Sequence, residues 1–231
     1  MTTIDLVQRI LLRSGTTWVL WALGALSVAS AAVIVERWFF LRSRDCDPRA
    51  LAGRLRAHLA RRDFAAAAAA LGQTRSVAAA VATAGLKLAE LGPVAAEKSM
   101  QSAAALERGR MERWLAYLGT VGNNAPFVGL FGTVIGIIGA FEELGRGSAH
   151  AAGGATAQLA SQAVMSSIAE ALVATAVGIF VALPAVAAFN YFQRRIASLL
   201  LATDAVANLV IAHIAGEPAD GARSGAELGD P

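Results

Sequence analysis

One acidic side chain interrupts an otherwise apolar stretch of the sequence. Residues 167–180 read SIAEALVATAVGIF, and Glu170 is the only ionisable residue among them. An ionised carboxylate within the hydrocarbon of a bilayer costs roughly 2.5 to 3.5 kcal/mol even on a lenient scale, so acids there usually face a protein interior or a hydrated cavity. A carboxyl group in such a place suits the uptake and release of protons. The alternative is that Glu170, only about two turns into the stretch, reaches the membrane interface.

Two rows of small residues accompany this acid. In each of two apolar stretches, positions i, i+4, i+7 and i+11 share one face of a helix. The first row is Gly129, Thr133, Gly136 and Ala140, and the second is Ala171, Thr175, Gly178 and Ala182. Small residues let helix backbones approach closely in lipid, and a threonine hydroxyl can bond a carbonyl one turn back. The rows predict either plain helix packing or the lining of a narrow, slightly polar passage.

The acid and the second row do not share a face. Five residues separate Glu170 from Thr175, which is about 140° around a straight helix. If a passage exists, Glu170 therefore faces a neighbouring subunit or the edge of the cavity rather than the same axis as Thr175.

Other chemistry finds no support in the sequence. Glu170 has no neighbouring acid, histidine or nucleophile that would form a hydrolytic site, so we expect no enzyme. The glycine series GLFGTVIGIIG (residues 129–139) lacks the GxGxxG spacing, and no GK[ST] motif occurs, which argues against a nucleotide site. Cys46 stands alone and the histidines are scattered, so we expect neither a metal nor a cofactor; they are His58, His150 and His213.

The composition predicts a membrane protein. Hydrophobic residues make up 56% of the 231 residues and gather in three blocks, at 18–35, about 117–141 and about 163–192. About 20 apolar residues cross a bilayer. The first block could also be a cleaved signal peptide behind Arg9 and Arg13, but its apolar residues continue past Ala32 and arginines follow. We therefore predict an all-α, polytopic membrane protein with three transmembrane helices and long helical cytoplasmic extensions.

Basic residues predict the orientation. Residues 42–113 hold 13 Lys and Arg against 7 Asp and Glu, and Arg194 and Arg195 directly follow the third block, so both segments should be cytoplasmic. The N-terminus and the short loop after the second block should lie outside. Anionic lipid is a better partner for these arginines than nucleic acid, since no nucleic-acid motif accompanies them.

The chain is expected to divide at the ends of the spans. The predicted segments are 1–41 with the first span, 42–116 as a cytoplasmic helical domain, 117–192 with the second and third spans, and 193–231 as a cytoplasmic helix and disordered tail. The helical domain is expected to contain three helices, with breaks at Gly72 and at Gly92-Pro93. The last helix is expected to run from about Val94 into the second span. Residues 145–154 read as a flexible loop.

Two segments together resemble the MotA/TolQ/ExbB proton channel family, closest to its ExbB/TolQ branch. They are NNAPFVGLFGTVIGIIGAF (residues 123–141) and SIAEALVATAVGIFVALPAVAAFN (residues 167–190). The resemblance covers about the C-terminal half of the chain. Two positions depart from the pattern: Ile135 replaces a frequent Trp, and Ser166-Ser167 replaces a frequent Pro-Gly.

The resemblance implies a subunit of a proton-driven motor in the bacterial inner membrane. It implies a homopentamer around an ExbD/TolR-like dimer of single-span subunits, whose membrane Asp relays protons, and a TonB/TolA-like or motility effector beyond it. The family's cavity-lining threonines correspond to Thr133 and Thr175, and its outer glutamate corresponds to Glu170. The departures leave room for a gliding-motility stator. Two other hypotheses are a non-conducting membrane scaffold and a sensor whose Arg-rich segment binds cytoplasmic proteins.

Overall fold

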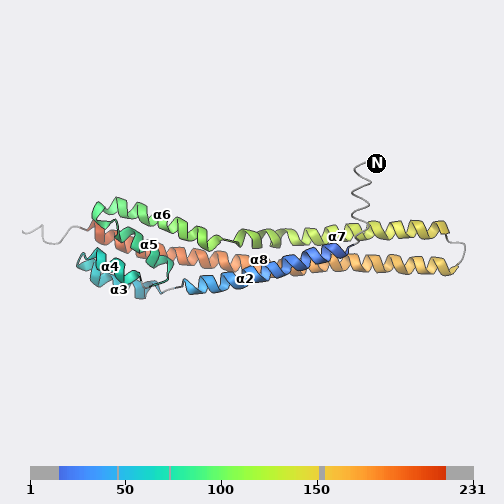
Figure 1. The fold of residues 1–231 in the computed structure, drawn as a ribbon, viewed down its shortest axis with the longest axis horizontal. Coiled ribbons are helices and arrows are strands. Elements are labelled where there is room, and N and C mark those ends of the chain that lie inside the picture. The colour runs from blue at the N-terminus through green and yellow to red at the C-terminus, as the bar shows by residue number, and fades with distance from the viewer. Residues whose placement is uncertain (1–15, 46, 73, 151–153, 217–231) are drawn as a thin grey trace, which may run out of the picture. The chain divides into compact units, whose positions relative to one another are not determined.

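The described part of the chain is helical. The computed structural model describes residues 16–45, 47–72, 74–150 and 154–216, and these contain no strand. Figure 1 labels the α-helices; the elements are α2 (Thr17–Ser43), α3 (Pro48–Ala60), α4 (Phe64–Leu71), α5 (Val77–Leu86), a 3-10 turn (Ala89–Leu91), α6 (Pro93–Glu112), α7 (Leu115–His150) and α8 (Gly154–Ala215). Three stretches are long and apolar enough to cross a membrane, namely Thr17–Ala60, Leu115–Glu142 and Val164–Ala215. The predicted all-α fold with three such helices is confirmed.

Some sequence-based expectations fall outside the described residues. These are the signal-peptide alternative at Arg9 and Arg13, the lone Cys46 and the tail beyond Gly216.

The helices group into two units. The first comprises residues 1–38 and 114–192, and the second comprises residues 39–113 and 193–231, so that α8 runs through both. In the first unit, α2 packs with α7 and the first part of α8 around one apolar core; its members are Val19, Leu23, Val121, Ala125, Ile135, Val181, Ala182 and Ala185. This core is what holds the membrane-length helices together within one chain. The assignment of the units to membrane and cytoplasm stays a prediction.

The second unit contains one more α-helix than expected between residues 48 and 112. The stretch expected as one helix before Gly72 is divided into α3 and α4. Arg62 there has a φ of 53°, in the left-handed region, and the carboxylate of Asp63 accepts a hydrogen bond from the Ala66 amide at 2.9 Å. That N-cap starts a new helix because it satisfies a first-turn amide. The expectation of three helices is therefore wrong.

Two further boundaries differ from those expected. The helix expected to run from Val94 into the second span ends at Glu112, and α7 begins at Leu115. Trp114 between them has a φ of 66°, a left-handed conformation that an α-helix does not contain. Neither Gly nor Pro marks the break. Helix α7 also continues to His150 through most of the expected loop at 145–154, whose residues 151–153 lie outside the described chain.

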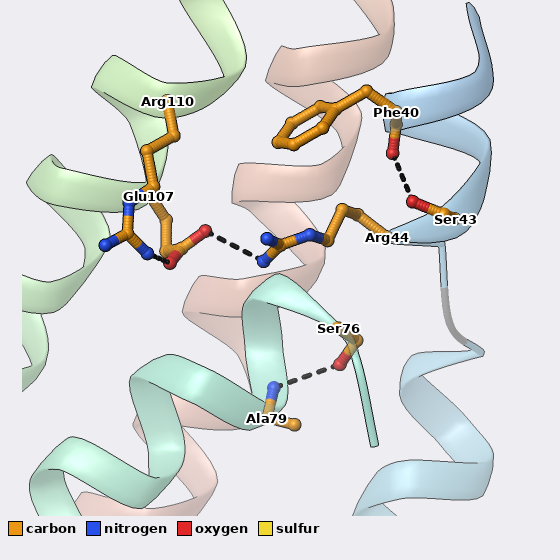
Figure 2. Close-up of polar contacts among 7 residues, drawn as sticks. All are labelled: Phe40, Ser43, Arg44, Ser76, Ala79, Glu107 and Arg110. Carbon is orange, nitrogen blue, oxygen red and sulfur yellow. Dashed lines mark hydrogen bonds and ion pairs between the residues drawn. The ribbon is translucent and has the colours of Figure 1, made fainter.

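A buried acid in the second unit bonds two arginines (Figure 2). Glu107 is only 5% exposed. One carboxylate oxygen accepts from Arg110 at 2.6 Å, and the other lies 3.3 Å from Arg44, just after α2. Arg44 also lies over the Phe40 ring. Figure 2 further shows the Ser76 hydroxyl capping α5 at the Ala79 amide.

Replacing Glu107 with glutamine is expected to lower the free energy of unfolding by about 1 to 3 kcal/mol. Hydrogen bonds to charged groups contribute on this scale when one partner is buried, and the exposure of Arg110 keeps the loss below that of a fully buried pair. Glu112→Gln on the same helix is the matched control, because its pair with Arg108 is exposed and should contribute less than about 0.5 kcal/mol. Denaturant unfolding of the purified full chain measures both; equal losses would contradict the assignment.

Candidate functional site

Glu170 lies on α8 in the first unit, close to the start of α2. Its Oε1 accepts a hydrogen bond from the Thr16 hydroxyl at 2.5 Å and lies 3.5 Å from the Thr17 hydroxyl. The residue is exposed on the single chain. The carboxyl group therefore lies at the surface of the first unit, with a close polar contact to the residue that precedes α2.

The sequence reasoning missed Thr16 and Thr17. The first apolar block begins at Trp18, so both threonines lie directly before it. A usable signal was present, because a Thr immediately before an apolar run is typical of a helix N-cap. The proximity of this cap to Glu170 joins residues 154 positions apart, which no local pattern indicates.

The two rows of small residues meet at the contact between α7 and α8. A Cβ atom built on Gly129 would lie 2.7 Å from the Ala174 carbonyl oxygen, and one on Gly178 would lie 2.7 Å from the Ala125 carbonyl oxygen. Such distances are below those of real contacts, so both positions exclude a side chain. The close approach of these backbones is the expected result of small residues on facing helices.

One more pair from the two rows meets in this contact. A Cβ on Gly136 would meet the Cβ of Ala171 at 2.5 Å. All six predicted lining or packing residues are buried in the first unit: Gly129, Gly136, Ala140, Ala171, Gly178 and Ala182. Their burial accounts for their size as helix packing, and a part in lining a passage stays a prediction. Gly132, which the pattern omitted, also excludes a side chain, because its Cβ would lie 2.9 Å from that of Ala174.

The two threonines of the rows differ in their hydrogen bonds. The Thr133 hydroxyl donates to the Leu130 carbonyl at 2.7 Å and is thereby satisfied. The Thr175 hydroxyl oxygen is buried and has no hydrogen-bond partner among the residues that the structure describes. Buried hydroxyls without a partner are uncommon, so the unused hydrogen-bonding capacity of Thr175 sets it apart from Thr133 among the described residues. No hydrogen bond joins Glu170 to either threonine in the described residues.

The described residues contain no candidate metal-binding site. In the parts of the chain that the structure describes, no group of three or more His, Cys, Asp or Glu residues is placed to hold an ion.

Comparison with known proteins shows that these residues lie in one segment that matches a protein family. The model of the MotA/TolQ/ExbB proton channel family matches residues 73–205, more than half of the chain. The chain belongs to the MotA/TolQ/ExbB proton channel family. Its matched segment contains Thr133, Glu170 and Thr175, together with all six small residues of the rows.

Similar curated proteins come from the ExbB/TolQ branch of this family. The chain is 38% identical over 112 residues to the biopolymer transport protein ExbB of Xanthomonas campestris pv. campestris, covering 48% of this chain and 41% of that one. It is 44% identical over 99 residues to the Tol-Pal system protein TolQ of Pseudomonas aeruginosa, covering 42% and 38%. The ExbB of Neisseria gonorrhoeae is 41% identical over 99 residues, covering 43% and 41%. The chain thus matches about two fifths of the length of these relatives.

Family membership and the three long apolar helices together establish a membrane protein of a proton channel family, on its ExbB/TolQ branch.

Proposed function

We propose that this protein is the channel, or stator, subunit of a proton-driven motor in the bacterial inner membrane. In this proposal it couples proton-motive force to mechanical work in the cell envelope through a single-span partner dimer. The observation that carries the proposal is Glu170, an acid in a membrane-length apolar helix within the segment that matches a proton channel family. The hydroxyl of Thr175 on the same helix, which has no partner in the described part of the chain, supports it.

The mechanism begins with proton entry from outside. A proton that moves inward with the membrane potential releases about 2.3 kcal/mol per 100 mV. In the proposal it passes by way of Glu170 and the hydroxyls of Thr175 and Thr133 to an Asp on the partner's span. Protonation of that Asp removes a charge from a low-dielectric environment. This changes the relative free energies of the positions that the partner can take within the channel. The partner then moves against the channel subunits and transmits force outside.

The proposed assembly is a homopentamer around an ExbD/TolR-like dimer. The N-terminus faces the periplasm and the C-terminus faces the cytoplasm, with the basic segments bordering anionic lipid. A TonB/TolA-like or motility effector receives the motion of the dimer.

Two alternatives have specific support. A gliding-motility stator is favoured by Ile135 and Ser166-Ser167, which depart from the pattern of the nutrient-uptake and envelope-division types. A non-conducting scaffold is favoured by the tight packing of Gly129 against Gly178, which accounts for the small residues without a passage.

The test is proton flux with and without the partner. The tagged full chain is purified from native membranes, any small single-span protein that accompanies it is identified, and both are placed in vesicles with an imposed proton gradient. The proposal expects flux that requires the partner and its membrane Asp. Flux equal to that of empty vesicles in every combination would overturn the proposal in favour of a scaffold.

A further inference from the structure

The start of α2 is held in place beside Glu170. Thr16 is only 5% exposed, although it directly precedes the helix. Its carbonyl oxygen accepts from the amides of Val19 at 3.1 Å and Leu20 at 3.4 Å, which makes Thr16 the N-cap of α2. The backbone of Thr16 is therefore fixed by the first turn of the helix.

The side chain of Thr16 is fixed as well. A Cβ on Gly136 would lie 3.0 Å from the Thr16 methyl carbon, so the methyl group rests where Gly136 leaves room on α7. The backbone and the methyl group of Thr16 are both held in position. The orientation of the hydroxyl group on the same Cβ atom is therefore fixed. That direction is toward Glu170, whose carboxylate oxygen accepts its hydrogen at 2.5 Å.

The chemistry of a hydroxyl suits a proton-exchanging carboxyl group. A threonine hydroxyl can donate to a carboxylate, and once the carboxyl group is protonated it can donate to the carbonyl oxygen or accept from the acid O–H. The positive end of the α2 dipole also favours a negative charge at this place. Thr17 adds little, because its hydroxyl is 3.5 Å away, at the limit of a hydrogen bond.

We propose that Thr16 is a positioning residue that holds the carboxyl group of Glu170 at the N-terminus of α2 in both of its protonation states. The functional part of this inference rests on the proposed role of Glu170 in the proton pathway. The hydrogen bond fixes where the proton is received, at a junction of α2 with α7 and α8. A proton path in this family member then includes its first membrane helix as well as the two that carry the threonine rows.

The test compares infrared bands of the Glu170 carboxyl group in the purified full chain. The bands are assigned by their loss in Glu170→Gln, at pH values on both sides of the titration. Thr16→Val keeps the shape of the side chain but removes the hydroxyl, and Thr16→Ser restores the hydroxyl without the methyl group. Thr17→Val is the matched control, with the same substitution one residue along.

We expect Thr16→Val to move the carbonyl band of protonated Glu170 to higher frequency, because a carbonyl without its hydrogen bond is stiffer. Thr16→Ser should return the band toward its original place, and Thr17→Val should leave it there. Unmoved bands in Thr16→Val would overturn the inference, as would an equal shift in Thr17→Val.

Proton flux with the partner then separates this inference from the proposed function. We expect Thr16→Val to reduce flux about tenfold, the effect of removing one hydrogen bond to a charged group, and to have no further effect in Glu170→Gln. Normal flux in Glu170→Gln would overturn the proposed role of Glu170 while leaving the band shift, and hence the positioning contact, in place. Normal flux in Thr16→Val with loss in Glu170→Gln would overturn only the functional role of Thr16.

Discussion

Replacing Glu170 with glutamine is expected to reduce proton flux to that of vesicles without the protein. Glutamine keeps the length of the side chain and an oxygen that can accept the Thr16 hydroxyl hydrogen bond at this position. It does not exchange a proton at accessible pH. The loss therefore reports proton exchange rather than a change in packing, since Glu170 is exposed on the single chain.

The matched control for this variant is Asp204→Asn on the same helix. Asp204 is also an exposed acid on α8, but it belongs to the second unit. Its neutralisation removes one negative charge and should leave flux within about twofold, because single exposed charges contribute little. If Glu170→Gln conducted as well as Asp204→Asn, the acid would have only a structural role.

Replacing Gly178 with alanine is expected to lower the free energy of unfolding by about 1 to 3 kcal/mol, the usual cost of an overpacked contact. The new methyl group would lie 2.7 Å from the Ala125 carbonyl oxygen and 3.1 Å from the Gly129 Cα. Both are backbone atoms, so relief requires the movement of one helix away from the other. Gly129→Ala should have a similar effect, because it meets the Ala174 carbonyl oxygen at 2.7 Å.

Gly139→Ala on α7 is the control for this pair. Nothing lies within 4 Å of a Cβ at that position, and alanine favours a helix over glycine by up to about 1 kcal/mol. Thermal unfolding of the full chain in detergent, followed by circular dichroism, should show a lower midpoint for Gly178→Ala and an equal or higher one for Gly139→Ala. A lower midpoint for all three would indicate a general intolerance of the membrane helices to substitution.

The local breaks in the helices were the hardest features to predict. A helix start with a capping acid, such as Asp63, leaves a trace in the sequence, but it is missed when only glycines and prolines are taken as helix ends. The break at Trp114 has neither residue, and a large aromatic side chain in a left-handed conformation is unfavourable by itself. Only contacts made elsewhere in the fold can hold it, so no local rule identifies it.

The candidate site could be predicted in part. Glu170 and the rows containing Thr133 and Thr175 stand out because a membrane makes acids and hydroxyls costly in an apolar helix. The rows also show which face of each helix carries small side chains. They do not show that Gly129 and Gly178 face each other. Nor do they show that, among the described residues, the Thr175 hydroxyl lacks a hydrogen-bond partner while Thr133 has one. Both facts depend on how the two helices are rotated about their axes.

By itself, the sequence determined that this chain is an all-α membrane protein with three long apolar helices, and it indicated the family through two short segments. Length and hydropathy suffice for this, since a bilayer selects helices by these properties alone. Only the tertiary structure decided which groups meet. The Thr16 hydroxyl reaches Glu170 because Gly136 has no side chain and leaves room for the start of α2 against α7. The two residues are 154 positions apart, and the spacing of residue types along a helix does not predict a contact over that distance.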